Sequence, residues 1–389
     1  MDFRFSPTEE AFRREIRAFL KAELPAEWAR GGGSGNLGEG GDDSWEFLRA
    51  FQRKLSQKGL LTLGWPVEHG GRAAGVMQQV IYNEEMAYHR APTQLGVGPD
   101  RVGPTIILYG TEEQKARHLP GIANAEAVWC QGFSEPAAGS DLAALETRAV
   151  LDGDHFVVNG QKIWTSLAHR ADWCILLVRT DPDAPKHKGI SYLLADMRLP
   201  GIQVAPLVDI TGRHAFNQIF FEDVRVPRAC LVGELNRGWY VAAATLDFER
   251  SGINRVVAGV RVFEELVEFT RLKATHNRGV RAKLAELAIE LAAGRLLAYR
   301  VASMQAKGQL PNAEASMSKM YGSELQQRLA NAGMQIMGLP GQVESGRWAP
   351  LAGRLEQYYL STSALTVAAG TSEVQRNIIA GRGLGLPRD

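Results

Sequence analysis

The chain has 389 residues, of which 45% are hydrophobic and 22% are charged. This length allows two or three domains with a large core, and the composition is ordinary for a soluble globular protein. A net charge of +1 argues against a general attraction to nucleic acid or to an anionic membrane surface. The N-terminus has no apolar signal core, and no apolar run reaches the ~18 residues of a membrane span. We therefore predict a cytoplasmic protein with no nucleic-acid partner and no membrane partner.

The cysteines of the chain are Cys130, Cys174 and Cys230. They are far apart and form no C-x-x-C pair, which argues against a zinc site and against a disulfide framework. Their spacing fits a reducing compartment, and no metal site is predicted.

The first third of the chain is predicted to be helical. Ser6 can cap a helix that begins at Pro7, and Glu9 can complete the capping box. The apolar residues that follow share one helical face: Phe12, Ile16, Phe19 and Leu20. A second capping box at 111–114 predicts another helix start. The glycine-rich stretch 31–41 has no strand before it, so we interpret it as a loop and not as a phosphate-binding site.

The middle third has the pattern of an antiparallel β-domain, from about residue 128 to about residue 232. The pairs Asp152-Gly153 and Asn159-Gly160 are typical of hairpin turns. The strand-like runs are FVVNGQKIW, WCILLVR, ISYLLA and QIFFEDVRV, all rich in β-branched and aromatic residues.

The last third returns to helical periodicity. Four segments are long enough for helices: 239–270, 281–307, 313–337 and 355–369. Together they predict a four-helix bundle. The predicted fold class is therefore α+β, with an N-terminal helical domain (1–127), a middle antiparallel β-domain (128–235) and a C-terminal four-helix bundle (236–389).

Two stretches carry candidate chemistry. CQGFSEPAAGSD, residues 130–141, mixes small residues and hydroxyls, which let the backbone approach a ligand closely. NGQKIWTS, residues 159–166, places Trp164 beside hydroxyls at a strand end, where an indole can cover a flat ring. A ligand site and a capped turn with a core tryptophan are equally good interpretations of these residues alone.

These two stretches, together with GTSEVQRNIIAGRGLGLPR at 370–388, resemble the acyl-CoA dehydrogenases. The resemblance covers nearly the whole chain in the family's order of helices, β-domain and helical bundle. It implies FAD as cofactor, an acyl-CoA thioester as substrate and an electron-transferring flavoprotein as electron acceptor. It also implies a homotetramer or dimer of dimers, with a heterotetramer as an open alternative.

The resemblance assigns candidate cofactor contacts by position. The residues that match flavin-contacting positions are Gln131, Phe133, Ser134, Trp164 and Ser166. The residues that match positions at the diphosphate and adenosine of FAD are Thr371 and Glu373, and those that meet a neighbouring subunit's FAD are Gln335 and Gly338. Ser140 matches a serine that contacts coenzyme A. The R-x-x-F-G motif of many members is absent from RLKATHNRGV at 271–280, so the adenosine end of FAD is predicted to be held differently.

The position of the catalytic base departs from the commonest family pattern. That pattern places a glutamate in a Y-E-G-T stretch, whereas this chain reads Ala368-Ala369-Gly370-Thr371. Alanine has no group that can accept the proton that leaves the α carbon of an acyl-CoA. A minority pattern, like that of the isovaleryl and long-chain members, has its glutamate on an earlier helix just before an arginine, and Glu249 matches that position in LDFERSG. We predict Glu249 as the base, against the alternative of a solvated helical glutamate.

Four further residues are predicted to contact the substrate: Asp247, Arg250, Ala369 and Gly370. In the family the backbone N–H at the position of Ala369 helps to polarise the thioester carbonyl, and alanine keeps that N–H. Arg250 matches an arginine near coenzyme A, with an ion pair to Asp247 as the equal alternative.

The small side chains of Ala368 and Ala369 predict space for a branched, cyclic or otherwise bulky acyl chain. Two other functions stay open. One is a non-catalytic partner subunit in a mixed tetramer, and the other is an oxygen-using flavin monooxygenase or oxidase of the same fold.

Overall fold

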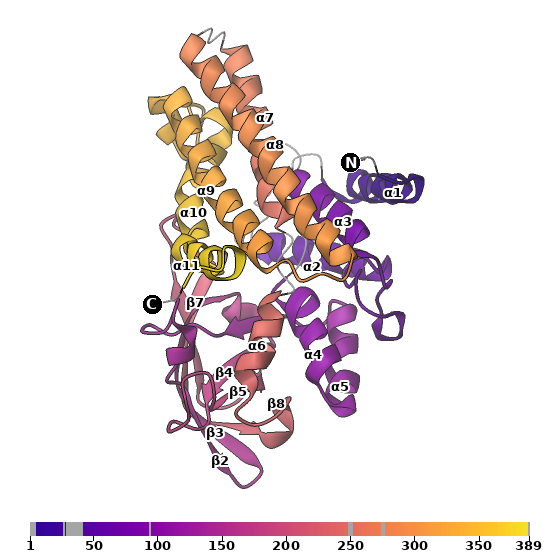
Figure 1. The fold of residues 1–389 in the computed structure, drawn as a ribbon, viewed down its shortest axis with the longest axis vertical. Helices are drawn as coiled ribbons and strands as arrows, with labels where there is room; N and C mark the ends of the chain where they lie inside the picture. Colours follow the sequence, from indigo (N-terminus) through magenta and orange to yellow (C-terminus); the bar gives the residue numbers. More distant parts are fainter. Residues whose placement is uncertain are drawn as a thin grey trace. The chain divides into compact units, whose positions relative to one another are not determined.

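The computed structural model describes residues 5–25, 28, 42–92, 95–247, 252–273 and 277–387, without the side chains of residues 42, 43, 246 and 247. The chain divides into two compact units. The first contains the described residues of Met1–Gly35, Gly75–Ala91 and Arg250–Asp389, and the second those of Asn36–Ala74 and Pro92–Glu249. Figure 1 shows helices first, then a sheet, then helices again along the chain. This order confirms the predicted fold class. The predicted loop at 31–41 lies outside the described residues.

The first helix, α1 (Pro7–Glu23), begins at the predicted capping box. The Glu9 N–H donates to Ser6 Oγ at 3.2 Å, and the Ser6 N–H donates to a Glu9 carboxylate oxygen at 2.7 Å. The predicted apolar face is buried at Phe12, Ile16 and Leu20, so the helix is stabilised by packing as well as by its cap.

The other helices of this part of the chain are α2 (Asp42–Gln57), α3 (Val76–Tyr88), α4 (Gly103–Tyr109) and α5 (Glu112–Ala123). The second predicted capping box is also confirmed. Thr111 Oγ1 accepts from the Gln114 N–H at 3.3 Å, and the Gln114 side chain accepts from the Thr111 N–H at 3.2 Å.

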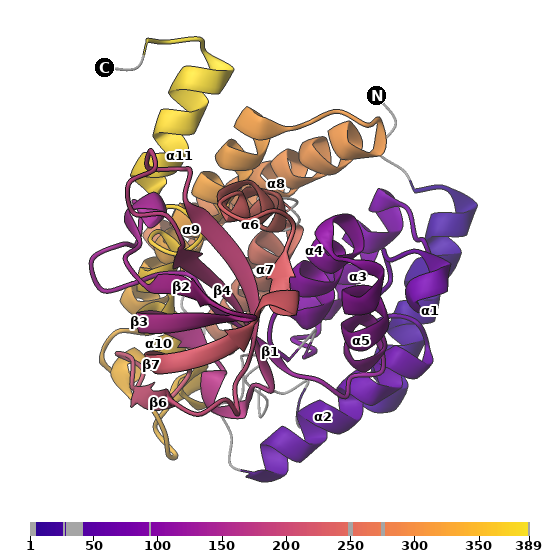
Figure 2. The same cartoon turned by 90° about the horizontal axis from the view of Figure 1, so that it is seen from below.

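The strands form one sheet within the described residues, in the order β6-β7-β3-β2-β4-β5-β8, with β1 paired to β4 (Figure 2). Their bounds are β1 (Trp129–Gly132), β2 (Arg148–Asp152), β3 (His155–Ser166), β4 (Trp173–Arg179), β5 (Ile190–Asp196), β6 (Ile202–Leu207), β7 (Phe216–Pro227) and β8 (Leu231–Val232). Residues 174–178 of β4 and 190–195 of β5 are fully buried. The core of the second unit therefore lies along these two strands.

The sheet is not purely antiparallel as predicted. β1 runs parallel to β4, and β2 meets β4 in a parallel pairing at Arg148 and Arg179. Residues 133–172, 40 in all, separate β1 from β4 and include the β2–β3 hairpin. A connection of that length lets the second strand return in the same direction.

The hairpin predicted at Asp152-Gly153 is confirmed, because β2 and β3 pair antiparallel on either side of it. The hairpin predicted at Asn159-Gly160 is wrong, since both residues lie inside β3. There β7 carries an extra residue, and the pairing shifts between Val158 and Gly160. The Asn159 side chain bonds the Asp223 carboxylate and N–H, both at 2.9 Å, so this dipeptide stabilises a bulge.

The C-terminal helices are α6 (Gly238–Asp247), α7 (Ile253–Leu272), α8 (Arg278–Ala306), α9 (Asn312–Met337), α10 (Arg354–Leu365) and α11 (Ser372–Ile378). The segment predicted as one helix at 239–270 is two helices, α6 and α7. The second begins after Gly252, whose left-handed φ of +65° lies outside the helical region. Helices α7, α8 and α9 run side by side (Figure 1) around Leu266, Leu287 and Leu329.

Within the described residues, no helix combines the length and the apolar character needed to cross a membrane.

Candidate active site

The first predicted flavin segment lies on β1 and just after it. The Gln131 side chain accepts from an Arg101 guanidinium N–H at 3.3 Å. Phe133 is buried in the core of the second unit, with its ring edge-to-face against Tyr192. Because the Phe133 side chain packs in the core, a ligand on this surface can contact only the backbone of Phe133. The half-buried Ser134 follows it in the chain.

Trp164 decides between the two interpretations of the second segment. It is 56% exposed, although large aromatic side chains are usually well buried. Its backbone φ of +59° is left-handed, which costs roughly 1–3 kcal/mol for a residue other than glycine. The pairing with β7 shifts between Lys162 and Thr165, so a bulge turns this indole out of the sheet. A core tryptophan is thereby excluded, and the exposed ring favours a ligand platform. Ser166 ends the same strand and is half-buried.

A buried ion pair joins these two segments, and sequence reasoning missed it. The Lys162 ammonium is fully buried and lies 2.7 Å from a Glu135 carboxylate oxygen. It also donates to the Phe133 carbonyl at 3.1 Å. A signal was present, because the period of two in β3 places Lys162 on the same face as buried Phe156 and Val158.

Burial and the attraction between the two groups act on this pair in opposite directions. Burial lowers the pKa of Lys162 to about 8, although the Glu135 carboxylate opposes that shift. Burial alone would raise the pKa of Glu135, but the ammonium of Lys162 and the hydrogen bonds to the carboxylate hold this pKa below its usual value.

The turn that replaces the family's Y-E-G-T stretch belongs to the first unit. Ala369 has a φ of +54° and Gly370 a φ of +85°. The Lys319 ammonium, itself buried, donates to the carbonyls of Gly370 at 2.6 Å and Leu365 at 3.1 Å. The Gln375 amide donates to the Ala369 carbonyl at 3.2 Å. Sequence reasoning missed both side chains. Lys319 lies far from this turn in the sequence, and Gln375 is not one of the positions matched to the family.

Side-chain hydrogen bonds thus fix the carbonyls of the turn, whereas one backbone N–H of the turn remains available as a donor. In the part of the chain that the structure describes, the Ala369 N–H has no protein acceptor. Ala368 and Ala369 are both exposed in the first unit. The turn therefore offers a backbone donor flanked by small side chains.

Of the other matched residues, Thr371 caps α11, and its hydroxyl accepts from the Val374 N–H at 3.2 Å. Glu373 is exposed, and hydrogen bonds to its own backbone N–H and to the Thr371 hydroxyl lower its pKa. A carboxylate repels a diphosphate, so Glu373 suits a hydroxyl or amino group of the adenosine better.

Gln335 and Gly338 are exposed at the end of α9, and Ser140 is exposed in the connection after β1; none of them takes part in a described contact with the other matched residues. Glu249 and Arg250 lie outside the described residues, as does the side chain of Asp247.

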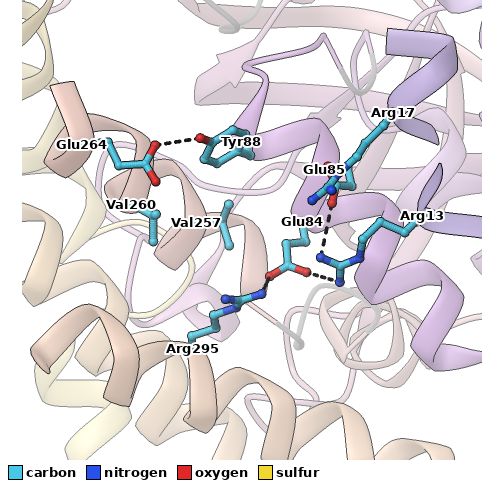
Figure 3. Close-up of a pocket in the computed structure, with 9 residues that line it drawn as sticks. All are labelled: Arg13, Arg17, Glu84, Glu85, Tyr88, Val257, Val260, Glu264 and Arg295. Carbon is cyan, nitrogen blue, oxygen red and sulfur yellow. Dashed lines mark hydrogen bonds and ion pairs between the residues drawn. The ribbon is translucent and has the colours of Figure 1, made fainter. Parts of the chain in front are cut away.

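A charged pocket of about 190 Å³ also occurs in the first unit (Figure 3). It is lined by Arg13, Arg17, Glu84, Glu85, Tyr88, Val257, Val260, Glu264 and Arg295. Arg13 and Arg295 approach the buried Glu84 from two sides, and Tyr88 donates to Glu264 at 2.7 Å. The arginine and glutamate charges balance, and none of the predicted site residues lines the pocket. Its ion pairs link three helices: Arg13 of α1 and Arg295 of α8 both bind Glu84 of α3.

The sequence matches three family models in consecutive order. They are the N-terminal domain of acyl-CoA dehydrogenase at residues 6–126, the middle domain at 130–224 and the C-terminal domain at 236–384. The chain belongs to the acyl-CoA dehydrogenase family.

Curated and solved relatives agree with this assignment. Acyl-CoA dehydrogenase IpdE1 of Mycobacterium tuberculosis is 40% identical over 388 residues, which cover 98% of each chain. The solved structure of the Tcur3481-Tcur3483 steroid ACAD is 36% identical, with a TM-score of 0.91 over 100% of both chains. The ChsE4-ChsE5 complex from Mycobacterium tuberculosis is 35% identical, with a TM-score of 0.88 over 100% of both chains.

This acyl-CoA dehydrogenase family member is accordingly an oxidoreductase that acts on a CH–CH group. Members of the family are flavoproteins, and FAD is their usual cofactor. The residues present fit such a group. The exposed, left-handed Trp164 offers a flat apolar surface, and the half-buried hydroxyls of Ser134 and Ser166 lie on the two segments beside it.

Proposed function

We propose that the chain oxidises the α,β-bond of a bulky acyl-CoA thioester to the 2-enoyl-CoA, with FAD as cofactor and an electron-transferring flavoprotein as acceptor. One observation carries this proposal beyond the family assignment. Where the commonest family pattern has a glutamate, the chain has Ala369 in a left-handed turn, with its N–H available and its side chain small.

The residues that we propose for FAD binding are Gln131, Phe133, Ser134, Trp164, Ser166, Thr371 and Glu373, with Gln335 and Gly338 toward the FAD of a neighbouring subunit. When bound, FAD would supply the acceptor for the β hydrogen, which leaves the acyl chain as a hydride with two electrons. Trp164 covers the flat ring and keeps water from it, and the hydroxyls of Ser134 and Ser166 bond its polar edge.

Glu249 is the proposed base and takes the proton from the α carbon. The α proton is only weakly acidic, so the thioester oxygen needs a hydrogen-bond donor as negative charge develops on it. The Ala369 N–H is that donor, and Lys319 and Gln375 hold the carbonyls around it. Ser140, Asp247, Arg250 and Gly370 complete the proposed substrate-binding set.

The proposed substrate has a branched or ring-bearing acyl group. Ala368 and Ala369 occupy the positions of a tyrosine and a glutamate in the commonest family pattern, so they leave room for a wide acyl group. The similarity to a steroid ACAD supports a polycyclic acyl-CoA in particular.

A second function has its own support. Two of the solved relatives are complexes of two named proteins, Tcur3481-Tcur3483 and ChsE4-ChsE5. The chain could therefore be one half of a mixed oligomer in which a sister chain brings the base. Alanine at 369 favours this alternative, and Glu249 argues against it.

The test is anaerobic mixing of the FAD-loaded protein with acyl-CoAs that range from short straight chains to polycyclic side chains. We expect bleaching of the flavin absorbance with the bulky substrates. Glu249→Gln should lower the bleaching rate by about 10²- to 10⁴-fold, the usual contribution of a general base. Glu268→Gln, an exposed glutamate on α7, is the matched control and should react like the wild type.

Two results would contradict the proposal. Faster bleaching by short straight-chain acyl-CoAs than by polycyclic ones would contradict the proposed preference for a bulky acyl group. Bleaching only after co-expression with a sister chain, and independent of Glu249, would establish the partner-subunit alternative.

A further inference from the structure

We propose that the buried Glu135–Lys162 pair positions the flavin-binding surface of the sheet. It acts through the backbone of residues 133–134 and 163–165 and does not touch the cofactor itself. This inference rests on the proposed function, because it takes FAD as the ligand of this surface.

Lys162 ties the end of the first segment to β3. Its ammonium bonds the Phe133 carbonyl at 3.1 Å and the Glu135 carboxylate at 2.7 Å. One residue further along β3, the Ile163 N–H donates to the Ser134 carbonyl at 2.9 Å. The backbone around Ser134 is therefore held at two successive points against the residues that lead into Trp164.

Glu135 fixes the other side of the same segment. Its two carboxylate oxygens accept from the N–H groups of Glu146 at 2.6 Å and Thr147 at 2.9 Å. Thr147 in turn donates from its hydroxyl to the Gln161 carbonyl at 3.2 Å. Three chain segments, 133–135, 146–147 and 161–163, thus meet at one carboxylate and one ammonium, and two of them lead into the proposed flavin contacts.

The left-handed conformation of Trp164 needs support on both sides of its bulge. On one side is Lys162, with its side chain fully buried. On the other side the buried Asn217 amide donates to the Thr165 carbonyl at 3.0 Å. A residue in this backbone region persists only where its surroundings fix it, so the pair helps to determine where the exposed indole points.

Gly132 makes room for the lysine side chain. A Cβ at this position would lie 3.3 Å from Lys162 Cγ and 3.0 Å from Cys174 Sγ. A side chain at residue 132 would therefore press against the methylene stem of Lys162.

Stability alone does not account for such a pair. Two apolar residues of the same volume are often as stabilising as a buried ion pair, because burial removes the solvation of both charges. An apolar pair cannot supply directed bonds to the Phe133 carbonyl and to the N–H groups of Glu146 and Thr147. Those bonds set backbone positions, which is the property that a rigid ring needs from its binding surface.

The test compares Glu135→Gln, Lys162→Met and the double variant with the wild type. Replacing both partners avoids the uncompensated buried charge of a single variant, so the double variant should fold with a similar circular dichroism spectrum. We expect its FAD dissociation constant to rise about 10- to 100-fold, as when groups that orient metal ligands are lost. The flavin absorbance maxima and the reduction potential should also shift. Glu135→Gln keeps only one of the two oxygens that accept from the N–H groups of Glu146 and Thr147 and leaves the buried Lys162 ammonium without its counter-charge, so this single variant should also lose FAD affinity.

Lys283→Met is the matched control, because it removes a lysine from an exposed ion pair with Glu286 on α8. It should leave FAD affinity, spectrum and potential unchanged. A folded double variant with wild-type affinity, spectrum and potential would overturn the inference. So would a loss of thermal stability that is equal with and without FAD, because it would make the pair purely structural. Failure of the wild type to bind FAD is a distinct result and would overturn the proposed function as well.

Discussion

At the scale of single residues, the proposed site separates at position 369 two tasks that the commonest family pattern gives to one glutamate. The side chain of that glutamate takes a proton and its backbone N–H polarises the thioester. Here alanine keeps the N–H, which has no protein acceptor in the described part of the chain. The proton-accepting task is assigned to Glu249 by sequence alone, since that residue lies outside the described ranges.

This separation predicts that the base can be moved. Adding Ala369→Glu to the Glu249→Gln variant should raise kcat/KM at least tenfold, against the roughly 10²- to 10⁴-fold that Glu249→Gln alone loses. We expect this recovery only with short straight-chain acyl-CoAs. The new side chain fills the space that a bulky acyl group needs. The measurement is kcat/KM for one short and one polycyclic substrate. Restoration with the polycyclic substrate would show that position 369 does not limit acyl width.

The sequence indicated Trp164 as a candidate flavin contact but did not predict its backbone conformation or its exposure. The residue type and the neighbouring hydroxyls suggested a platform, whereas the φ of +59° and the exposure depend on the bulge opposite β7. Lys162 and Glu135 were overlooked because charged residues are normally solvated. Only the pairing of distant segments shows that these two side chains neutralise each other.

At the scale of elements, the middle of β3 depends on a glycine. Gly160 has a φ of +146°, and a Cβ there would lie 2.7 Å from both Cα and Oγ1 of Thr147 in the preceding connection. Neither the backbone angle nor the contact suits another residue.

Gly160→Ala should therefore lower the free energy of unfolding by about 2–4 kcal/mol, from backbone strain and overpacking together. Gly153→Ala is the matched control. It also has a left-handed φ, of +58°, but its Cβ would point into open space, so about 1 kcal/mol is expected. Urea unfolding monitored by circular dichroism gives both values. Equal losses would mean that the close approach to Thr147 is relaxed at no cost.

The same element shows where sequence patterns succeed and fail. Capping boxes at Ser6 and Thr111 are local, and both are confirmed. The Asn159-Gly160 dipeptide has the chemistry of a tight turn, but the sheet overrides it because β7 supplies a bulge as its partner. The parallel pairings of β4 depend on tertiary arrangement and leave no local signal.

At the scale of the whole molecule, one buried histidine couples stability to pH. His118 is 5% exposed and lies edge-on against Trp129 and Trp173. Burial, together with the neighbouring Arg117, lowers its pKa to about 4. The unfolded chain takes up this proton near pH 6.5, so between pH 6.5 and 4 it binds a proton that the folded chain does not.

Stability should consequently be complete above pH 6.5 and decline as the pH falls toward 4. The contribution of His118 is on the order of 2–3 kcal/mol. His118→Phe should flatten the pH dependence of the unfolding free energy in this window, whereas His187→Gln, at an exposed site, should not. An unchanged slope in His118→Phe would assign the acid sensitivity to other groups, such as His89 and His169, whose pKa values burial also lowers.

The division into two units has a consequence for the order in which the protein forms during synthesis. The first unit takes its helices from both ends of the chain, so Val80 of α3 packs with Val257 of α7 and Ala298 of α8. These partners are translated about 200 residues later, which corresponds to roughly 10–40 s on a ribosome. The strands of the second unit end with β8 at Val232, before α7 begins at Ile253. The sheet can therefore fold first, while the apolar face of α3 stays without its final partners on α7 and α8 until those helices are translated.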